Sequence, residues 1–440
     1  YGQNPLVKMY WDNEKSRPAA DNPWFNEVSP NQVFSFGYDF NHESTYTVDY
    51  FNDVLAFWLD EYRVDGYRLD FTKGLTNRPG DGGFYDASRI RILKDYADHL
   101  WNEFPEAYVI LEHFAPQNEE QELAEHGMLV WGNHNHNFNE IAMGYQSGSD
   151  FSWSSYQNRG MDEPMVVSYM ESHDEERMLY KTSTWGNQSG DYDTRDLQTG
   201  LERAKMASTL WLTVPGPKLM WMFGELGYDI SIDDPCRVCE KPIRWRYLTD
   251  SRRSSLKEHY ADLFRLRAEH DVFSTSDFSI NASSYVKWVH LRGDDNEVLS
   301  VGNIDVNQQS MRIPVQVDAR WTDFFTGRVF TSRNGAIEAD LEPGEYLLLS
   351  TVPFREVESQ DSEITISSNL NTGQLTVSSL LPLQGVWVYD MAGREIYARE
   401  NIGSSAFLVD LTSNWYAGHL VILCQDERGH KKSFRWVVNP

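Results

Sequence analysis

Short apolar strands alternate with amphipathic helices through the middle of this chain, and this alternation limits the fold more than any other feature. Helical stripes at residues 48–63 and 88–104 each precede an apolar run that ends in an acid. Apolar strands separated by helices are typical of a parallel sheet with helices packed outside it. We predict five such strands, near residues 64–70, 108–112, 128–131, 165–170 and 218–223.

The periodicity changes after about residue 272. Short strands separated by Gly, Asn and Asp turns predict an all-β domain over residues 272–352. A polar linker at 353–362 and a β-sandwich at 363–440 follow. A closed barrel of this type needs eight strands. The predicted fold is therefore α/β: a (β/α)8 barrel lacking its first three strands over residues 1–271, plus two all-β C-terminal domains. We expect the three strands to precede Tyr1, which would make the chain a truncated fragment.

The charge balance argues against several kinds of partner. Lys and Arg number 39 against 66 Asp and Glu, a net charge of −27. Binding to a nucleic-acid backbone depends on Lys and Arg, so no nucleic-acid partner is expected. The sequence has no run of 18 apolar residues, and no membrane span is predicted. A neutral small molecule or polymer remains open as a partner.

Cysteine and histidine offer few metal ligands. Three cysteines, Cys236, Cys239 and Cys424, do not make a disulfide framework. The C-x-x-C pair lacks the second pair that structural zinc requires, so a local disulfide or a pair of loop thiols is expected there. The alternating Asn and His run at 133–137 favours a polar loop at the barrel mouth over a metal site.

Three predicted strands run into acids: Asp70, Glu112 and Asp174. Side chains at the C-terminal strand ends of a parallel barrel converge on one site. Two carboxylates flanking one bond are what glycoside hydrolysis requires. Arg68 lies on the same strand face as Asp70, where its charge favours the ionised carboxylate. One such acid is more often a helix cap or ion-pair partner, but three on adjoining strands favour an active site.

The blocks around these acids are Gly66-Tyr67-Arg68-Leu69-Asp70, Ile110-Leu111-Glu112 and Ser172-His173-Asp174. They resemble the second, third and fourth conserved blocks of the alpha-amylase family, glycoside hydrolase family 13. The resemblance implies that Asp70 is the nucleophile and Glu112 the general acid/base. It implies that Asp174 binds and distorts the sugar at the cleavage point. The further side chains that it assigns to substrate binding are Arg68, His173, Lys73 and Arg177.

The resemblance also implies a calcium ligand, Asp39, within Tyr38-Asp39-Phe40-Asn41, and no organic cofactor. Two positions depart from the family pattern. Ser172 stands where Asn is usual, and Gly74 stands where many members have His. The family's first block, which ends in Asn-His, is not among these residues. Three loop or strand-end aromatics are expected near the cleft: Trp24, Phe25 and Trp131.

The C-terminal residues carry a second resemblance. Val388-Tyr389-Asp390-Met391-Ala392-Gly393-Arg394 and Trp415-Tyr416-Ala417-Gly418 are similar to the β-sandwich sorting domain of the type IX secretion system. The usual Pro-Asn-Pro is replaced by Asn369-Leu370-Asn371. This resemblance implies the secretion machinery as a partner and a secreted or cell-surface protein. The alternative is a small carbohydrate-binding or immunoglobulin-like sandwich.

Three functional hypotheses follow. The first is an enzyme, a retaining glycoside hydrolase acting on the α-1,4 bonds of starch- or glycogen-type glucans. The second is a transglycosylase, such as an α-1,4-glucan branching enzyme, which shares the chemistry up to the covalent intermediate. The third is a truncated chain without activity. Hydrolysis assays separate the third from the others, and product chain lengths separate the first two.

Overall fold

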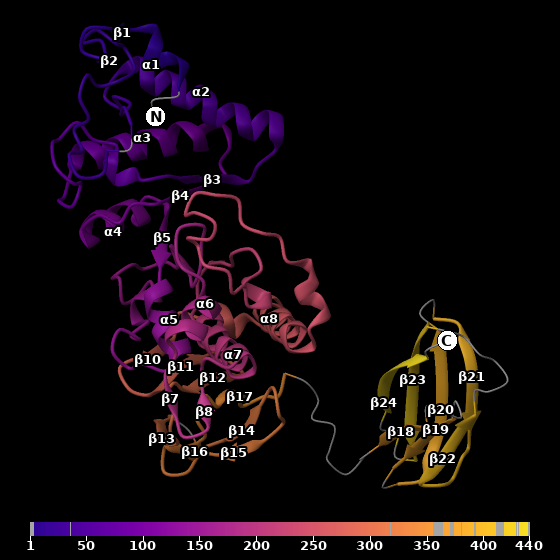
Figure 1. Cartoon of the computed structure of the whole chain (residues 1–440). Helices are drawn as coiled ribbons and strands as arrows, with labels where there is room; N and C mark the ends of the chain where they lie inside the picture. The colour runs from indigo at the N-terminus through magenta and orange to yellow at the C-terminus, as the bar shows by residue number, and fades with distance from the viewer. Residues whose placement is uncertain are drawn as a thin grey trace. The chain divides into compact units, whose positions relative to one another are not determined.

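The computed structural model describes residues 4–354, except 36 and 317, and residues 364–438, except 370–373, 380, 391–392, 411–417, 428 and 430. The chain divides into two compact units, Tyr1–Val352 and Pro353–Pro440 (Figure 1). Residues 355–362 of the predicted linker lie outside the described residues. No helix in the described part of the chain is long and apolar enough to cross a membrane.

A five-stranded parallel sheet forms the centre of the first unit. Its strands lie in chain order, β3-β4-β5-β6-β9, and every neighbouring pair is parallel. The strand-and-helix alternation predicted from the sequence is confirmed, and the sheet is that of an α/β barrel with five of eight strands in the described residues. The strands are β3 (Gly66–Leu69), β4 (Tyr108–Leu111), β5 (Leu129–Asn133), β6 (Val166–Tyr169) and β9 (Lys218–Leu219).

Helices pack against this sheet through their apolar stripes. In α3 (Ala87–Glu103), the N-cap Asp86 accepts hydrogen bonds from the first-turn N–H groups, which starts the helix. Leu93 and Leu100 of α3 are buried in one core with Val109 and Leu111 of β4. Each such side chain contributes roughly 1.5–3 kcal/mol. The other helices of this part are α1 (Pro5–Met9), α2 (Thr45–Tyr62), α4 (Gln117–Glu125), α5 (Asn135–Met143), α6 (Met178–Trp185), α7 (Leu197–Thr213) and α8 (Ser251–Glu269).

The register of β3 and β4 places two acids side by side. Gly66 pairs with Tyr108 and Leu69 pairs with Leu111, so the next residues, Asp70 and Glu112, leave the sheet together. The two strands approach closely at the other end. A Cβ on Gly66 would lie 2.2 Å from the Tyr108 carbonyl oxygen, so only glycine fits there without a shift.

No helix is predicted from the sequence for the segments of α1, α5 and α6. The expected polar loop at 133–137 is wrong: β5 ends at Asn133 and α5 begins two residues later. The polar start of α5 hid its apolar face, on which Phe138 and Ile141 are fully buried. Gly144, in the left-handed conformation, ends this helix.

An antiparallel β domain completes the first unit. Its main sheet has the order β10-β11-β12-β17-β14-β15, and β13 pairs with β16. Strands β14 and β15 are separated by a turn, in which Asp323 accepts hydrogen bonds from the N–H and hydroxyl of Thr326. The strands are β10 (Phe278–Asn281), β11 (Val286–Arg292), β12 (Glu297–Asn303), β13 (Gln309–Pro314), β14 (Arg320–Asp323), β15 (Val329–Thr331), β16 (Ala336–Leu341) and β17 (Tyr346–Ser350), and two short pairs, β1 (Trp11–Asp12) with β2 (Arg17–Pro18) and β7 (Gln188–Ser189) with β8 (Tyr192–Asp193), lie earlier.

The second unit is all-β, as predicted. It has two antiparallel sheets, of order β18-β19-β22 and β21-β20-β23-β24. Leu375, Val386 and Ile422 from both sheets are buried in one core. The strands are β18 (Thr365–Asn369), β19 (Gln374–Ser378), β20 (Leu383–Asp390), β21 (Glu395–Glu400), β22 (Ala406–Asp410), β23 (Gly418–Asp426) and β24 (Lys431–Val438).

Candidate active site

Arg68 joins the acids at the ends of β3 and β4. Its Nη1 lies 2.9 Å from Oδ1 of Asp70, and its Nη2 lies 2.9 Å from Oε1 of Glu112. The guanidinium also lies over the Trp131 ring, 5.1 Å from its centroid. A planar guanidinium can hold two carboxylates in fixed positions, which an ammonium cannot. Three of the residues predicted for the site are thus in direct contact.

The two carboxyl groups differ in environment. The Asp70 side chain is 56% exposed and that of Glu112 only 14%. Burial raises the pKa of Glu112, against a hydrogen bond from the Phe71 N–H and the charge of Arg68, and the charge and hydrogen bonding of Asp70 raise it further. A buried acid beside an exposed one is the arrangement that separates a proton donor from a nucleophile.

The backbone after Asp70 is shaped to support Glu112. Phe71 adopts a left-handed conformation with φ 46°, which is rare for a bulky residue. Its N–H donates to Oε2 of Glu112 at 2.8 Å. The Thr72 N–H and hydroxyl both donate to the Glu112 carbonyl, at 2.9 and 3.1 Å. The left-handed turn therefore directs main-chain donors at Glu112.

The third acid lies on the segment after β6. Asp174 is exposed, and its Oδ2 lies 3.3 Å from Nε2 of His173. The His173 ring lies 5.8 Å from that of Trp221. Arg177 is placed differently from its neighbours, because it is 2% exposed and donates to the carbonyls of Ser172 and Glu175. Arg177 therefore holds the main chain of this segment through hydrogen bonds to its carbonyls.

Glu175 holds the same segment to the neighbouring strands. Its Oε1 accepts hydrogen bonds from Asn133 at 2.6 Å and from the Tyr169 hydroxyl at 3.1 Å. Its Oε2 accepts one from Ser172. Burial and the charges of Glu175 and Glu112 raise the pKa of Tyr169, which stays a neutral donor between the two acids. Sequence reasoning missed Glu175, although an acid directly after Asp174 was a signal.

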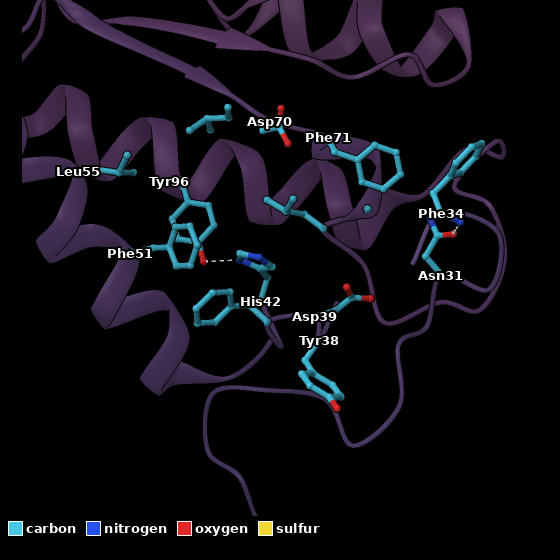
Figure 2. Close-up of a pocket in the computed structure, with 14 residues that line it drawn as sticks. Asn31, Phe34, Tyr38, Asp39, His42, Phe51, Leu55, Asp70, Phe71 and Tyr96 are labelled. Carbon is cyan, nitrogen blue, oxygen red and sulfur yellow. Dashed lines mark hydrogen bonds between the residues drawn. The ribbon is translucent and has the colours of Figure 1, made fainter. Parts of the chain in front are cut away.

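An apolar pocket of about 300 Å³ adjoins Asp70. Six of its fourteen lining residues are Phe or Tyr, and Figure 2 shows the Asp70 carboxyl near the Phe71 ring. Lys73 borders this wall, since its Nζ lies 4.7 Å from the centroid of the Phe34 ring. Trp24 and Phe25, two of the aromatics expected near the cleft, do not line this pocket. Its lining is Asn31, Phe34, Tyr38, Asp39, Phe40, His42, Phe51, Leu55, Leu69, Asp70, Phe71, Gly74, Leu75 and Tyr96.

Asp39 lies on the wall of this pocket, with Ser29 donating a hydrogen bond to its Oδ2. Burial raises the pKa of Asp39, against the hydrogen bond from Ser29. Within the described residues, no group of three or more His, Cys, Asp or Glu is arranged to hold a metal. Calcium ligation by Asp39 stays a prediction, because calcium also binds carbonyl and amide oxygens.

Among the remaining candidates for metal binding, the two cysteines and His136 have other partners. Cys236 and Cys239 form a disulfide, one of the two arrangements expected in place of zinc. His134 is buried, and burial lowers its pKa to about 3. His136 is exposed on α5, with its Nδ1 3.7 Å from Glu140.

A parallel barrel sheet with paired carboxylates at adjoining strand ends defines the class of barrel glycosidases. Comparison with known proteins agrees: the profile of the alpha-amylase catalytic domain matches residues 19–286, and the chain belongs to this family. A 1,4-alpha-glucan branching enzyme of Salinibacter ruber is 25% identical over 322 residues, 64% of this chain and 49% of that protein. A cyclomaltodextrinase of Geobacillus thermopakistaniensis is 23% identical over 317 residues, 68% of this chain and 47% of that protein. The chain thus spans about half the length of these relatives.

Solved structures share the fold at low sequence identity. Amy13B of Eubacterium rectale has a TM-score of 0.58 and 14% identity, covering 80% of this chain and 77% of that one. An Anoxybacillus alpha-amylase has a TM-score of 0.56 and 13% identity, covering 77% of this chain and 72% of that one. These likenesses agree with the barrel assigned from the strand order.

Proposed function

We propose that the protein is a retaining glycoside hydrolase acting on α-glucans with α-1,4 bonds. One observation carries the proposal: a single guanidinium, that of Arg68, contacts both the exposed Asp70 and the buried Glu112. Retaining glycosidases need two carboxyl groups only about 5–5.5 Å apart, one as nucleophile and one as acid. One arginine can bridge two acids only when they are close neighbours.

The roles follow from the two environments. Asp70, beside the positive charge of Arg68, attacks the anomeric carbon and forms the covalent glycosyl-enzyme. Glu112, whose pKa burial raises, gives its proton to the leaving oxygen and then takes one from the incoming water. Asp174 acts on the sugar at the cleavage point, together with His173.

The experiment is hydrolysis of soluble amylose, followed by reducing ends. Asp70→Asn should remove activity by several orders of magnitude while the circular dichroism spectrum is unchanged. Asp53→Asn, an exposed acid on α2, is the matched control and should retain full activity. Full activity of Asp70→Asn would refute the proposal.

A second candidate, transglycosylation, uses the same intermediate with a sugar acceptor in place of water. The similarity to a branching enzyme over 322 residues supports testing it. Branch points formed in amylose, detected by isoamylase digestion and chain-length analysis, would favour the transferase. Release of reducing ends without new branch points would favour the hydrolase.

We also propose that the second unit is an export module of the type IX sorting kind, which places the enzyme outside the cell or at its surface. Its separation as a compact unit with its own core supports this role. Removing the residues after Ser359 should abolish export and leave glucan hydrolysis unchanged. If the truncation weakens binding to insoluble starch and leaves export intact, the unit is a carbohydrate-binding module.

A further inference from the structure

A loop over residues 231–242, which follows β9, is fastened to the segment that carries Asp174. At the loop's base, the Ser231 hydroxyl donates to Oε2 of Glu176 at 2.7 Å. The Ile232 N–H donates to Oε1 of the same carboxylate at 2.8 Å. Glu176 lies two residues after Asp174, so these bonds join the ends of two strands, β6 and β9, beside the third acid.

The tip of the loop reaches Asp174 itself. Arg237 donates from Nη2 to the main-chain carbonyl of Asp174. The contact holds the backbone of the acid, which leaves its carboxylate to face His173. The loop therefore contacts the segment at two residues, Asp174 and Glu176, which lie on either side of Glu175.

Arg237 is held in place by its neighbours along the chain. It lies between Cys236 and Cys239, which form a disulfide, and the Cys239 N–H donates to the Cys236 carbonyl at 3.1 Å. Lys241 directs its ammonium at main-chain carbonyls of the loop, those of Ile232 and Cys236. The disulfide closes a small ring over residues 236–239, which includes Arg237.

We propose that the Cys236–Cys239 disulfide positions Asp174 through Arg237, so that turnover depends on the redox state of this pair. A dithiol reduces the S–S bond: two cysteine thiols form, and the dithiol supplies two electrons and two protons and becomes a disulfide. With the ring open, Arg237 loses the constraint that keeps it on the Asp174 carbonyl. Arg237 is a positioning residue in this account, acting on the sugar only through Asp174.

The kinetic part rests on the proposed function, so the test has two readouts. The first is hydrogen exchange at residues 172–177 in the oxidised protein and after dithiothreitol. Reduction should speed exchange there, and Cys236→Ser/Cys239→Ser should exchange at the reduced rate with or without dithiothreitol. Unchanged exchange on reduction would overturn the proposal whatever the enzyme does.

The second readout is amylose hydrolysis. Reduction should lower kcat several-fold with a smaller change in KM, because Asp174 acts on the distorted sugar more than on initial binding. Arg237→Ala should match the reduced enzyme, and Arg237→Lys should recover part of kcat. Cys424→Ala, in the second unit, should keep the full response to dithiothreitol. Equal kcat in both redox states would overturn the kinetic claim, whereas no hydrolysis in either state would refute the proposed function and leave the exchange result to decide on the loop.

Discussion

Arg68 and Glu112 meet at the carboxyl ends of neighbouring strands, with 2.9 Å between Nη2 and Oε1. The other terminal nitrogen of the guanidinium, Nη1, lies at the same distance from Oδ1 of Asp70. Arg68 therefore sets the geometry of the pair and balances part of its charge.

Arg68→Lys should lower kcat/KM although the charge is kept, because one ammonium cannot reach both carboxylates in fixed directions. A charged hydrogen bond contributes roughly 1.5–3 kcal/mol, so the loss should be about 10- to 100-fold. Arg91→Lys, on the exposed face of α3, is the control and should leave kcat/KM unchanged. An Arg68→Lys enzyme as active as the wild type would show that the bridge does not matter.

The rate should depend on pH in a bell shape. Glu112 must be protonated to act as an acid, and its raised pKa keeps it so to higher pH than an ordinary glutamate. The alkaline limb should therefore report Glu112. Glu112→Gln should lose roughly 10²–10⁴-fold in kcat, and its residual rate should lack this limb. A Glu112→Gln profile with the wild-type alkaline limb would assign that limb to another group.

Glu175→Gln should weaken catalysis without unfolding the protein. The amide places a donor group where the carboxylate accepts bonds from Asn133, Tyr169 and Ser172. The segment with Asp174 should then be held less firmly, and kcat should fall more than KM rises. Glu163→Gln, an exposed acid, is the control. Steady-state kinetics on amylose and the melting temperature separate a positioning effect from loss of fold.

Arg89 and Glu119 form a buried ion pair whose loss should destabilise the first unit. Both side chains are fully buried, with Arg89 Nε 2.6 Å from Glu119 Oε1, and His113 lies 3.0 Å from the same oxygen. Arg89→Met leaves the glutamate without its main partner, at a cost of about 3–5 kcal/mol. Lys94→Met breaks a partly exposed pair with Glu122 and should cost about 0–1 kcal/mol. Urea denaturation of both variants checks the difference.

Stability should fall as the pH is lowered from about 6.5, the ordinary histidine value. Burial lowers the pKa of His42 to about 4 and that of His259 to about 3. As the pH falls, the unfolded chain therefore binds protons on these histidines before the folded protein does. The free energy of unfolding decreases from about pH 6.5 down to the pKa of each buried histidine. Denaturation at pH 7.5 and 4.5 measures this loss. His259→Gln should reduce it, whereas His136→Gln, at an exposed position, should not.

The sequence predicts the local part of this site and little of its support. Asp70 and Glu112 follow apolar runs of similar length, and parallel register then makes them neighbours. The contact between Arg237 and Asp174 joins residues 63 apart, and no local pattern indicates it. Arg177 illustrates the same limit, because its burial beneath the Asp174 segment depends on how the strand-end loops pack and not on its block.

The close approach of Gly66 to Tyr108, at the amino end of β3, affects the positions of Asp70 and Glu112 at the carboxyl ends of β3 and β4. A larger residue at this position would clash with the Tyr108 backbone, and β3 and β4 would have to move relative to each other. The distance between the carboxyl groups of Asp70 and Glu112 would change as a result. Retaining and inverting glycosidases differ by only a few ångströms in this gap. The spacing of the two carboxyl groups is therefore expected to be sensitive to the side chain at residue 66, four residues before Asp70.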